Sequence, residues 1–226
     1  MRIRRKKHLQ ERLDMLTDLL LVPDRDIVNV KEAVKDKKYF DFHSLFLNYN
    51  PVELEIGCGK GGFIIEKAIR NPNVNFIAVE LLNNIIVMAA ELAKKHNLKN
   101  VKFINSGAEY LPRYIKDNSI SNIYLNFSPP FPPNSYESHR LTCERRVNEY
   151  KNFLHDGGSV FQKTDDKDFF DYSFNKFLES GFLVKNISED VNKGLTDNIV
   201  TEYERKFRQS GIYINCLIAT KTTNRN

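Results

Sequence analysis

Apolar residues along this chain form short runs that alternate with segments of helical periodicity. The runs predict strands near residues 52–56, 74–79, 101–104, 120–127, 158–163, 182–188 and 212–220. The segments between them predict helices near residues 61–70, 83–96, 108–116, 137–154 and 166–179. This alternation is typical of an α/β fold, in which helices cover both faces of a mostly parallel sheet.

Residues 1–50 precede this pattern, and we expect them to form an extension ahead of a main domain at 51–226. Leucines at helical spacing predict a short helix over residues 9–21, which Pro23 ends. The first twelve positions are rich in basic residues: Arg2, Arg4, Arg5, Lys6, Lys7 and Arg12. Clustered positive charge suits a polyanion such as RNA, although a solvated chain end would explain it equally well.

The first predicted strand of the main domain runs into a glycine-rich segment, VELEIGCGKGG. Gly57, Gly59 and Gly62 match a dinucleotide-binding fingerprint, and the next predicted strand ends in an acid, Glu80. This layout predicts a nucleotide-type cofactor, and a dehydrogenase that binds NAD remains one interpretation. Glu55 would oppose a pyrophosphate but suits the ammonium group of a methionine moiety, which favours S-adenosylmethionine. A tight turn without a ligand is the plain alternative.

The composition limits the class of protein. The chain has 226 residues, 41% of them hydrophobic, and a formal net charge of +5. No apolar run reaches membrane-spanning length, and no apolar signal-peptide core follows the basic start, so we expect a cytoplasmic protein without membrane contact. Three cysteines and five histidines show no disulfide or metal-ligand spacing, so we expect no metal site.

A proline-rich segment, here called the proline lip (residues 128–133), follows the predicted strand at 120–127. Four prolines in six residues exclude a helix or a central strand, so we expect a rigid, extended segment. Phe131 within it could stack on a base. The string SPPF also resembles the motif of amino-methyltransferases that act on an exocyclic base nitrogen, which leaves that activity as an alternative.

A second polar segment, NIVTEYERKF, lies near the end of the chain at residues 198–207. We expect Thr201, Glu202, Tyr203 and Glu204 in a loop or at a strand edge. Carboxylates and a hydroxyl there could accept hydrogen bonds from the Watson–Crick edge of guanine. A solvated acidic turn is the alternative for this segment taken alone.

Taken together, these motifs resemble the bacterial tRNA (guanine-N7)-methyltransferases. The matching strings are MRIRR with LQER, LEIGCGKGGF, LNFS followed by P-F-P, HRLT, QKTDD and VTEYERKF, and they cover nearly the whole chain in the family's order. The resemblance implies a class I, Rossmann-like methyltransferase: a doubly wound, seven-stranded, mostly parallel sheet with an antiparallel last strand. It implies methyl transfer from S-adenosylmethionine to N7 of the variable-loop guanine, position 46 of tRNA, to form 7-methylguanosine.

The resemblance and the motifs also suggest site residues. Those expected to bind the cofactor are Glu55, Gly57, Gly59, Glu80, Gly107 and Ala108. Those expected to bind the substrate are Asp165, Thr201, Glu202, Tyr203, Glu204 and Arg140, the last from a basic cluster that includes Arg145 and Arg146. The basic N-terminal arm is expected to contact the tRNA backbone, and no feature predicts an oligomeric state.

The chain departs from the family within the proline lip. Pro129 stands where the family has an aspartate, Phe131 where it has tryptophan, and Pro133 where it has lysine. The catalytic residue is therefore unassigned, and a catalytically impaired tRNA-binding relative is a further alternative. Guanine N7 carries a lone pair and no proton, so it needs no general base. Positioning alone can supply roughly 7–11 kcal/mol, and we expect Asp165 and Glu204 to orient the guanine while Phe131 walls its pocket.

Overall fold

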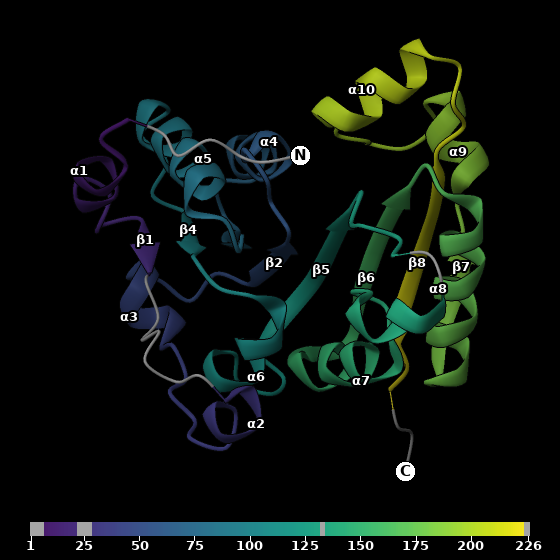
Figure 1. The fold of residues 1–226 in the computed structure, drawn as a ribbon, viewed down its shortest axis with the longest axis horizontal. Helices are drawn as coiled ribbons and strands as arrows, with labels where there is room; N and C mark the ends of the chain where they lie inside the picture. Colours follow the sequence, from purple (N-terminus) through teal and green to yellow (C-terminus); the bar gives the residue numbers. More distant parts are fainter. Residues whose placement is uncertain (1–6, 22–28, 132–133, 224–226) are drawn as a thin grey trace. The chain divides into compact units, whose positions relative to one another are not determined.

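The computed structural model describes residues 7–21, 29–131 and 134–223. The chain divides into two compact units, residues 1–116 and 117–226, which Figure 1 shows in colours that follow the sequence. Most of the basic arm and the residues at 132–133 lie outside the described residues. The expected boundary near residue 50 stays a prediction.

In the described part of the first unit, four strands pair in parallel. Their order is β1 (Leu20–Leu21), β4 (Val101–Ile104), β3 (Asn75–Val79) and β2 (Val52–Ile56). The helices are α1 (Leu9–Asp14), α2 (Val30–Ala33), α3 (Phe42–Phe46), α4 (Gly62–Arg70), α5 (Asn83–Lys95), the 3-10 helix η1 (Ala108–Tyr110) and α6 (Leu111–Tyr114). Every residue of β2 and β3 is buried, as expected for strands covered on both faces.

The N-terminal extension differs from its prediction. The helix expected over residues 9–21 ends at Asp14, and the chain then turns into β1, which pairs with β4. The reason is that Leu16, Leu19 and Leu20 bury themselves in the same core as α4 and α5. The Arg12 guanidinium also forms two 2.6 Å hydrogen bonds to the Glu91 carboxylate on α5, so this segment is part of the first unit's packing.

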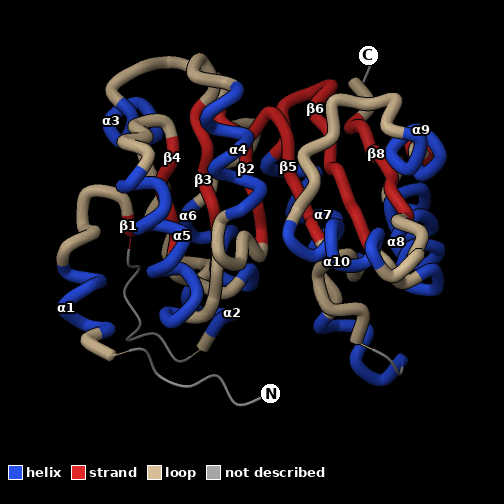
Figure 2. The backbone as a smooth tube through the Cα atoms, turned by 90° about the horizontal axis from the view of Figure 1, so that it is seen from above, coloured by secondary structure: helices blue, strands red, loops and turns tan. Residues whose placement is uncertain are grey.

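The second unit combines parallel and antiparallel strands. Their order is β5 (Ile120–Asn126), β6 (Leu154–Thr164), β8 (Asn215–Lys221) and β7 (Phe182–Asn186). β5 and β6 are parallel, whereas β8 runs antiparallel to both β6 and β7. The helices are η2 (Asn134–His139), α7 (Glu144–Phe153), α8 (Lys167–Glu179), α9 (Ser188–Lys193) and α10 (Glu202–Gln209). Figure 2 shows the strands in red and the helices in blue.

The fold class predicted from the sequence is confirmed: the protein is mixed α/β, with mostly parallel strands and an antiparallel last strand. Each of the seven predicted strands is present, and β1 is an addition. The helix expected at 137–154 begins only at Glu144, because the 3-10 helix η2 and a turn come first. The helix expected at 108–116 divides into η1 and α6, with Pro112 in the first turn of α6.

Gly61 allows α4 to begin close to α5, and this contact gives a testable prediction. Its φ is +86°, and an added Cβ would lie 2.8 Å from Ala89 Cβ. We expect Gly61→Ala to lower the free energy of unfolding by roughly 2–5 kcal/mol, from overpacking and left-handed strain together. Gly194 is the matched control, because its φ is +70° with nothing within 4 Å. Gly194→Ala should lose only roughly 1–2 kcal/mol. Equal losses in urea unfolding would show that the contact with Ala89 does not matter.

Candidate functional site

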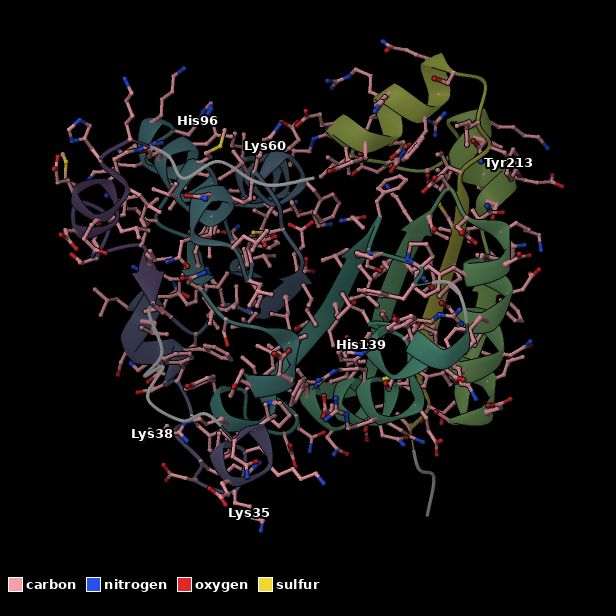
Figure 3. The ribbon with its side chains drawn as sticks, viewed as in Figure 1. Lys35, Lys38, Lys60, His96, His139 and Tyr213 are labelled. Atoms are coloured by element: carbon pink, nitrogen blue, oxygen red, sulfur yellow. The ribbon has the colours of Figure 1, made fainter. Side chains whose placement is uncertain are left out.

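The glycine loop at residues 57–62 joins β2 to α4 and includes Lys60, labelled in Figure 3. Gly57 and Gly59 have φ of +83° and +55°, a region that residues with a Cβ rarely adopt. The N–H groups of Gly57 and Cys58 donate to the Val79 carbonyl at 2.8 and 3.0 Å, which holds the loop against the end of β3. An added Cβ at Gly57 or Gly59 would meet nothing within 4 Å, so the loop borders space that a ligand can enter.

Two carboxylates lie at this loop. Glu80 follows β3, and its Oε2 and Oε1 accept hydrogen bonds from the N–H groups of Gly59 (3.2 Å) and Leu82 (3.0 Å). Glu55 is buried near the end of β2. Burial, followed by the negative charges of Glu55 and Glu80, raises the pKa of the Cys58 thiol well above its usual value. The two carboxylates place negative charge beside the loop, and carboxylates suit a cationic ligand better than a pyrophosphate.

The end of β4 lies beside Glu80. The Asn105 side-chain amide donates to the carbonyls of Glu80 (3.0 Å) and Leu81 (3.1 Å), so the segment that carries Gly107 and Ala108 is tied to the end of β3. The cofactor residues expected from the sequence thus lie on three neighbouring strand ends of the first unit.

A further acid that the sequence motifs do not predict, Glu109, follows this end of β4. The Glu109 carboxylate fills the space that a side chain at position 107 would need, because a Cβ added at Gly107 would collide with it. Within the described residues, no group donates a hydrogen bond to this carboxylate. The signal available in the sequence was an acid two positions after a glycine at a strand end, which is too common to single out.

In the second unit, the proline lip begins at the end of β5. Phe127 directly precedes the lip, and Phe131 is the last lip residue that the structure describes. Their φ values of +53° and +46° are unusual for residues other than glycine. Phe131 is 37% exposed, and its ring lies 5.9 Å from that of His139, which Figure 3 labels. Pro129 is also exposed. The lip therefore presents an aromatic ring at its surface.

Arg140, expected among the substrate contacts, is 8% exposed. Its Nε donates to the Pro130 carbonyl at 2.7 Å, and its guanidinium lies 4.3 Å from the centre of the Tyr172 ring. Arg146 of the same basic cluster is also buried and pairs with Glu149, whereas Arg145 is exposed. The structure thus separates the members of this cluster.

The end of β6 carries two aspartates with different surroundings. Asp166 caps α8, since its Oδ1 accepts a hydrogen bond from the Phe169 N–H at 2.8 Å. The neighbouring Asp165 is exposed. Because Asp166 does the capping, the carboxylate of Asp165 is available to a ligand.

Residues 201–204 do not form the expected loop or strand edge. Thr201 is the N-cap of α10, and its hydroxyl accepts a hydrogen bond from the Glu204 N–H at 3.0 Å. The sequence Thr-x-x-Glu is a capping-box signature that predicts this helix start, and it could have been read from the sequence. Glu202 and Tyr203 are exposed on the first turn, and Tyr203 stacks 6.3 Å from Phe127.

Glu204 faces the interior and is fully buried. Its carboxylate accepts hydrogen bonds from Lys163 Nζ (2.9 Å), Asn198 Nδ2 (2.7 Å) and Arg208 Nε (2.9 Å). Burial would raise the pKa of Glu204, but the charge of Lys163 and these hydrogen bonds outweigh it and lower the pKa below its usual value. Since Lys163 lies on β6, Glu204 fastens α10 to that strand.

Glu204→Gln tests this network through its pH dependence. Because its folded pKa is lowered, Glu204 stabilises the fold above roughly pH 4.3, and the contribution is lost as the pH falls through the folded value. We expect the variant to lose roughly 3 kcal/mol of unfolding free energy at neutral pH and the difference from wild type to shrink below about pH 4. Glu202→Gln on the same helix is the control, with an expected loss under about 0.5 kcal/mol. Urea unfolding across pH measures both, and a pH-independent difference would contradict the assignment.

The described residues contain no group of three or more His, Cys, Asp or Glu side chains that could hold a metal ion. In the same part of the chain, no helix combines the length and the apolar character that a membrane crossing needs. The three cysteines are buried and free.

Comparisons with known proteins match this chain to methyltransferases. A family model described as a putative methyltransferase matches residues 49–217. A tRNA (guanine-N(7)-)-methyltransferase of Clostridium tetani is 39% identical over 77% of this chain and 83% of the relative. One of the same name from Clostridioides difficile is 36% identical over 95% of this chain and 96% of the relative.

Solved structures resemble the fold. A 16S rRNA methyltransferase, KamB, has a TM-score of 0.60 at 16% identity and covers 83% of this chain and 96% of its own. A precorrin-6y C5,15-methyltransferase from Geobacter metallireducens has a TM-score of 0.53 at 14% identity, covering 89% and 94%. At these identities the likeness shows the fold alone, that of a class I methyltransferase.

Proposed function

Because the chain belongs to the tRNA (guanine-N7)-methyltransferase family, we propose that it transfers a methyl group from S-adenosylmethionine to N7 of a tRNA guanine, forming 7-methylguanosine. The observation that carries this proposal is the 36% identity with a relative of that name along 95% of the chain. A tRNA substrate also favours a cytoplasmic location.

The residues at the strand ends of the first unit fit the cofactor. The Glu80 carboxylate can accept hydrogen bonds from ribose hydroxyls in addition to those it already accepts, since each oxygen has two lone pairs. Glu55 provides negative charge for a methionine ammonium group, and the loop at Gly57 and Gly59 admits a ligand close to the backbone. Bound S-adenosylmethionine would supply an electrophilic methyl group on a positively charged sulfur.

The acceptor does not require a base from the protein, because guanine N7 has a lone pair and no proton. Pro129 in place of the family's aspartate is therefore compatible with turnover. We propose that the exposed Asp165 and Glu202 accept hydrogen bonds from the guanine's N1–H and amino groups, and that Phe131 covers a face of the base. Thr201 and Glu204 act indirectly. Their hydrogen bonds hold the helix turn that carries Glu202 and Tyr203.

Identification of the methylated nucleoside tests the activity. The protein is incubated with methyl-labelled S-adenosylmethionine and an unmodified tRNA transcript, and the RNA is then digested. We expect label in 7-methylguanosine, and none when the variable-loop guanine is replaced by adenine. Label on an exocyclic base nitrogen would instead select the amino-methyltransferase interpretation. Tight tRNA binding without any label would select an impaired relative.

We also propose that Glu109 reads the adenine of the cofactor. It follows the strand end beside Glu80, so the base of a ribose held by Glu80 would meet it, and its carboxylate can accept a hydrogen bond from the adenine amino group. Wild type should bind S-adenosylhomocysteine more tightly than S-inosylhomocysteine, which presents a carbonyl there, by a factor of about ten or more.

Glu109→Gln should remove or reverse that preference, because an amide can donate to the carbonyl of the inosyl compound. Glu66→Gln on α4 removes a carboxylate that pairs with Arg70 and should leave the preference unchanged. Calorimetric titration of both ligands measures the ratio. An unchanged ratio in Glu109→Gln would exclude Glu109 from base recognition.

A further inference from the structure

We propose that Arg140 is a positioning residue that fixes Pro130 and Phe131 of the proline lip and thereby presents the Phe131 ring to the substrate base, rather than a contact to tRNA phosphate. This inference rests on the proposed function for the identity of the substrate. The contacts that support it all lie within the second unit.

The guanidinium grips the backbone on both sides of Phe131. Nε donates to the carbonyl of Pro130 at 2.7 Å, and Nη2 lies 3.5 Å from the carbonyl of Phe131 itself. These two carbonyl groups flank the rotatable backbone bonds of Phe131. A cation that holds both therefore fixes the conformation of this one residue.

That conformation needs an external restraint. Phe131 has φ +46°, in the left-handed region where a Cβ is crowded against the backbone. Residues other than glycine persist there only when the surrounding structure imposes it, and such residues cluster at functional sites. Phe131 remains 37% exposed, so burial of this residue supplies only part of the restraint.

The guanidinium is itself held by α8. It lies 4.3 Å from the centre of the Tyr172 ring and 6.0 Å from that of Phe169. The Tyr172 hydroxyl donates to the Glu137 carboxylate of η2 at 2.7 Å. The lip, η2 and α8 are thus linked through one arginine, and a short flexible side chain at this position could not make the same contacts.

Because of these contacts, we do not expect Arg140 to bind a tRNA phosphate. Arg140 is 8% exposed, two of its nitrogens face lip carbonyls, and a ring covers a face of the guanidinium. Long-range attraction of tRNA would instead use exposed cations such as Arg145. Loss of Arg140 should therefore disturb the arrangement of the reacting groups more than the affinity for RNA.

The experiment compares Arg140→Met, Arg140→Lys, Phe131→Ala and the double variant Phe131→Ala/Arg140→Lys. We expect kcat to fall by roughly tenfold or more in both Arg140 variants, with the slope of tRNA affinity against salt unchanged in Arg140→Met. Lysine keeps the charge but cannot hold both carbonyls, so it should not rescue. The double variant should be no slower than Phe131→Ala, because Arg140 acts through that ring.

Three results would overturn the inference. They are a salt slope shallower by about one unit in Arg140→Met with normal kcat, full rescue by lysine, or losses that add in the double variant. If wild type shows no methyl transfer, the proposed function fails first. In that case, hydrogen exchange at residues 127–131 tests whether Arg140 restrains this backbone. If it does, Arg140→Lys must accelerate the exchange. Arg140→Lys also serves if Arg140→Met does not fold.

Discussion

Both candidate binding regions depend on hydrogen bonds that connect the carboxyl ends of parallel strands to other parts of the chain. In the first unit, the Val79 carbonyl accepts two N–H groups of the glycine loop, and Asn105 ties the end of β4 to Glu80. In the second unit, Lys163 on β6 holds Glu204 of α10. These contacts hold Glu80 in the first unit and the first turn of α10 in the second unit in defined positions.

A consequence is that residues of the same type act differently. Glu204 and Glu202 lie two positions apart, yet one is fully buried among cationic and amide donors and the other is exposed. Asp165 and Asp166 differ in the same way, since only Asp166 caps a helix. Methyl transfer to guanine N7 requires that the base be oriented toward the methyl group, and it requires no removal of a proton. In the proposed reaction, buried residues anchor the site and exposed residues contact the base, and this arrangement requires no aspartate at position 129.

The sequence allowed prediction of those features that depend on neighbouring residues. The strands follow from apolar runs, and the glycine loop follows from glycines at positions that need positive φ. The start of α10 was also predictable from Thr201 and Glu204, although a loop was expected there. The partners of Arg140 and Glu204 were not, because Tyr172 and Lys163 lie far away in sequence and meet them only in the folded chain.

Hydrogen exchange with and without ligands shows whether the strand ends of each unit form the binding regions. S-adenosylhomocysteine should slow amide exchange in residues 57–62, 80–83 and 105–109. Unmodified tRNA should slow it in residues 127–131, 164–166 and 199–204. Slower exchange confined to other segments, with these unchanged, would exclude the strand ends as the binding regions.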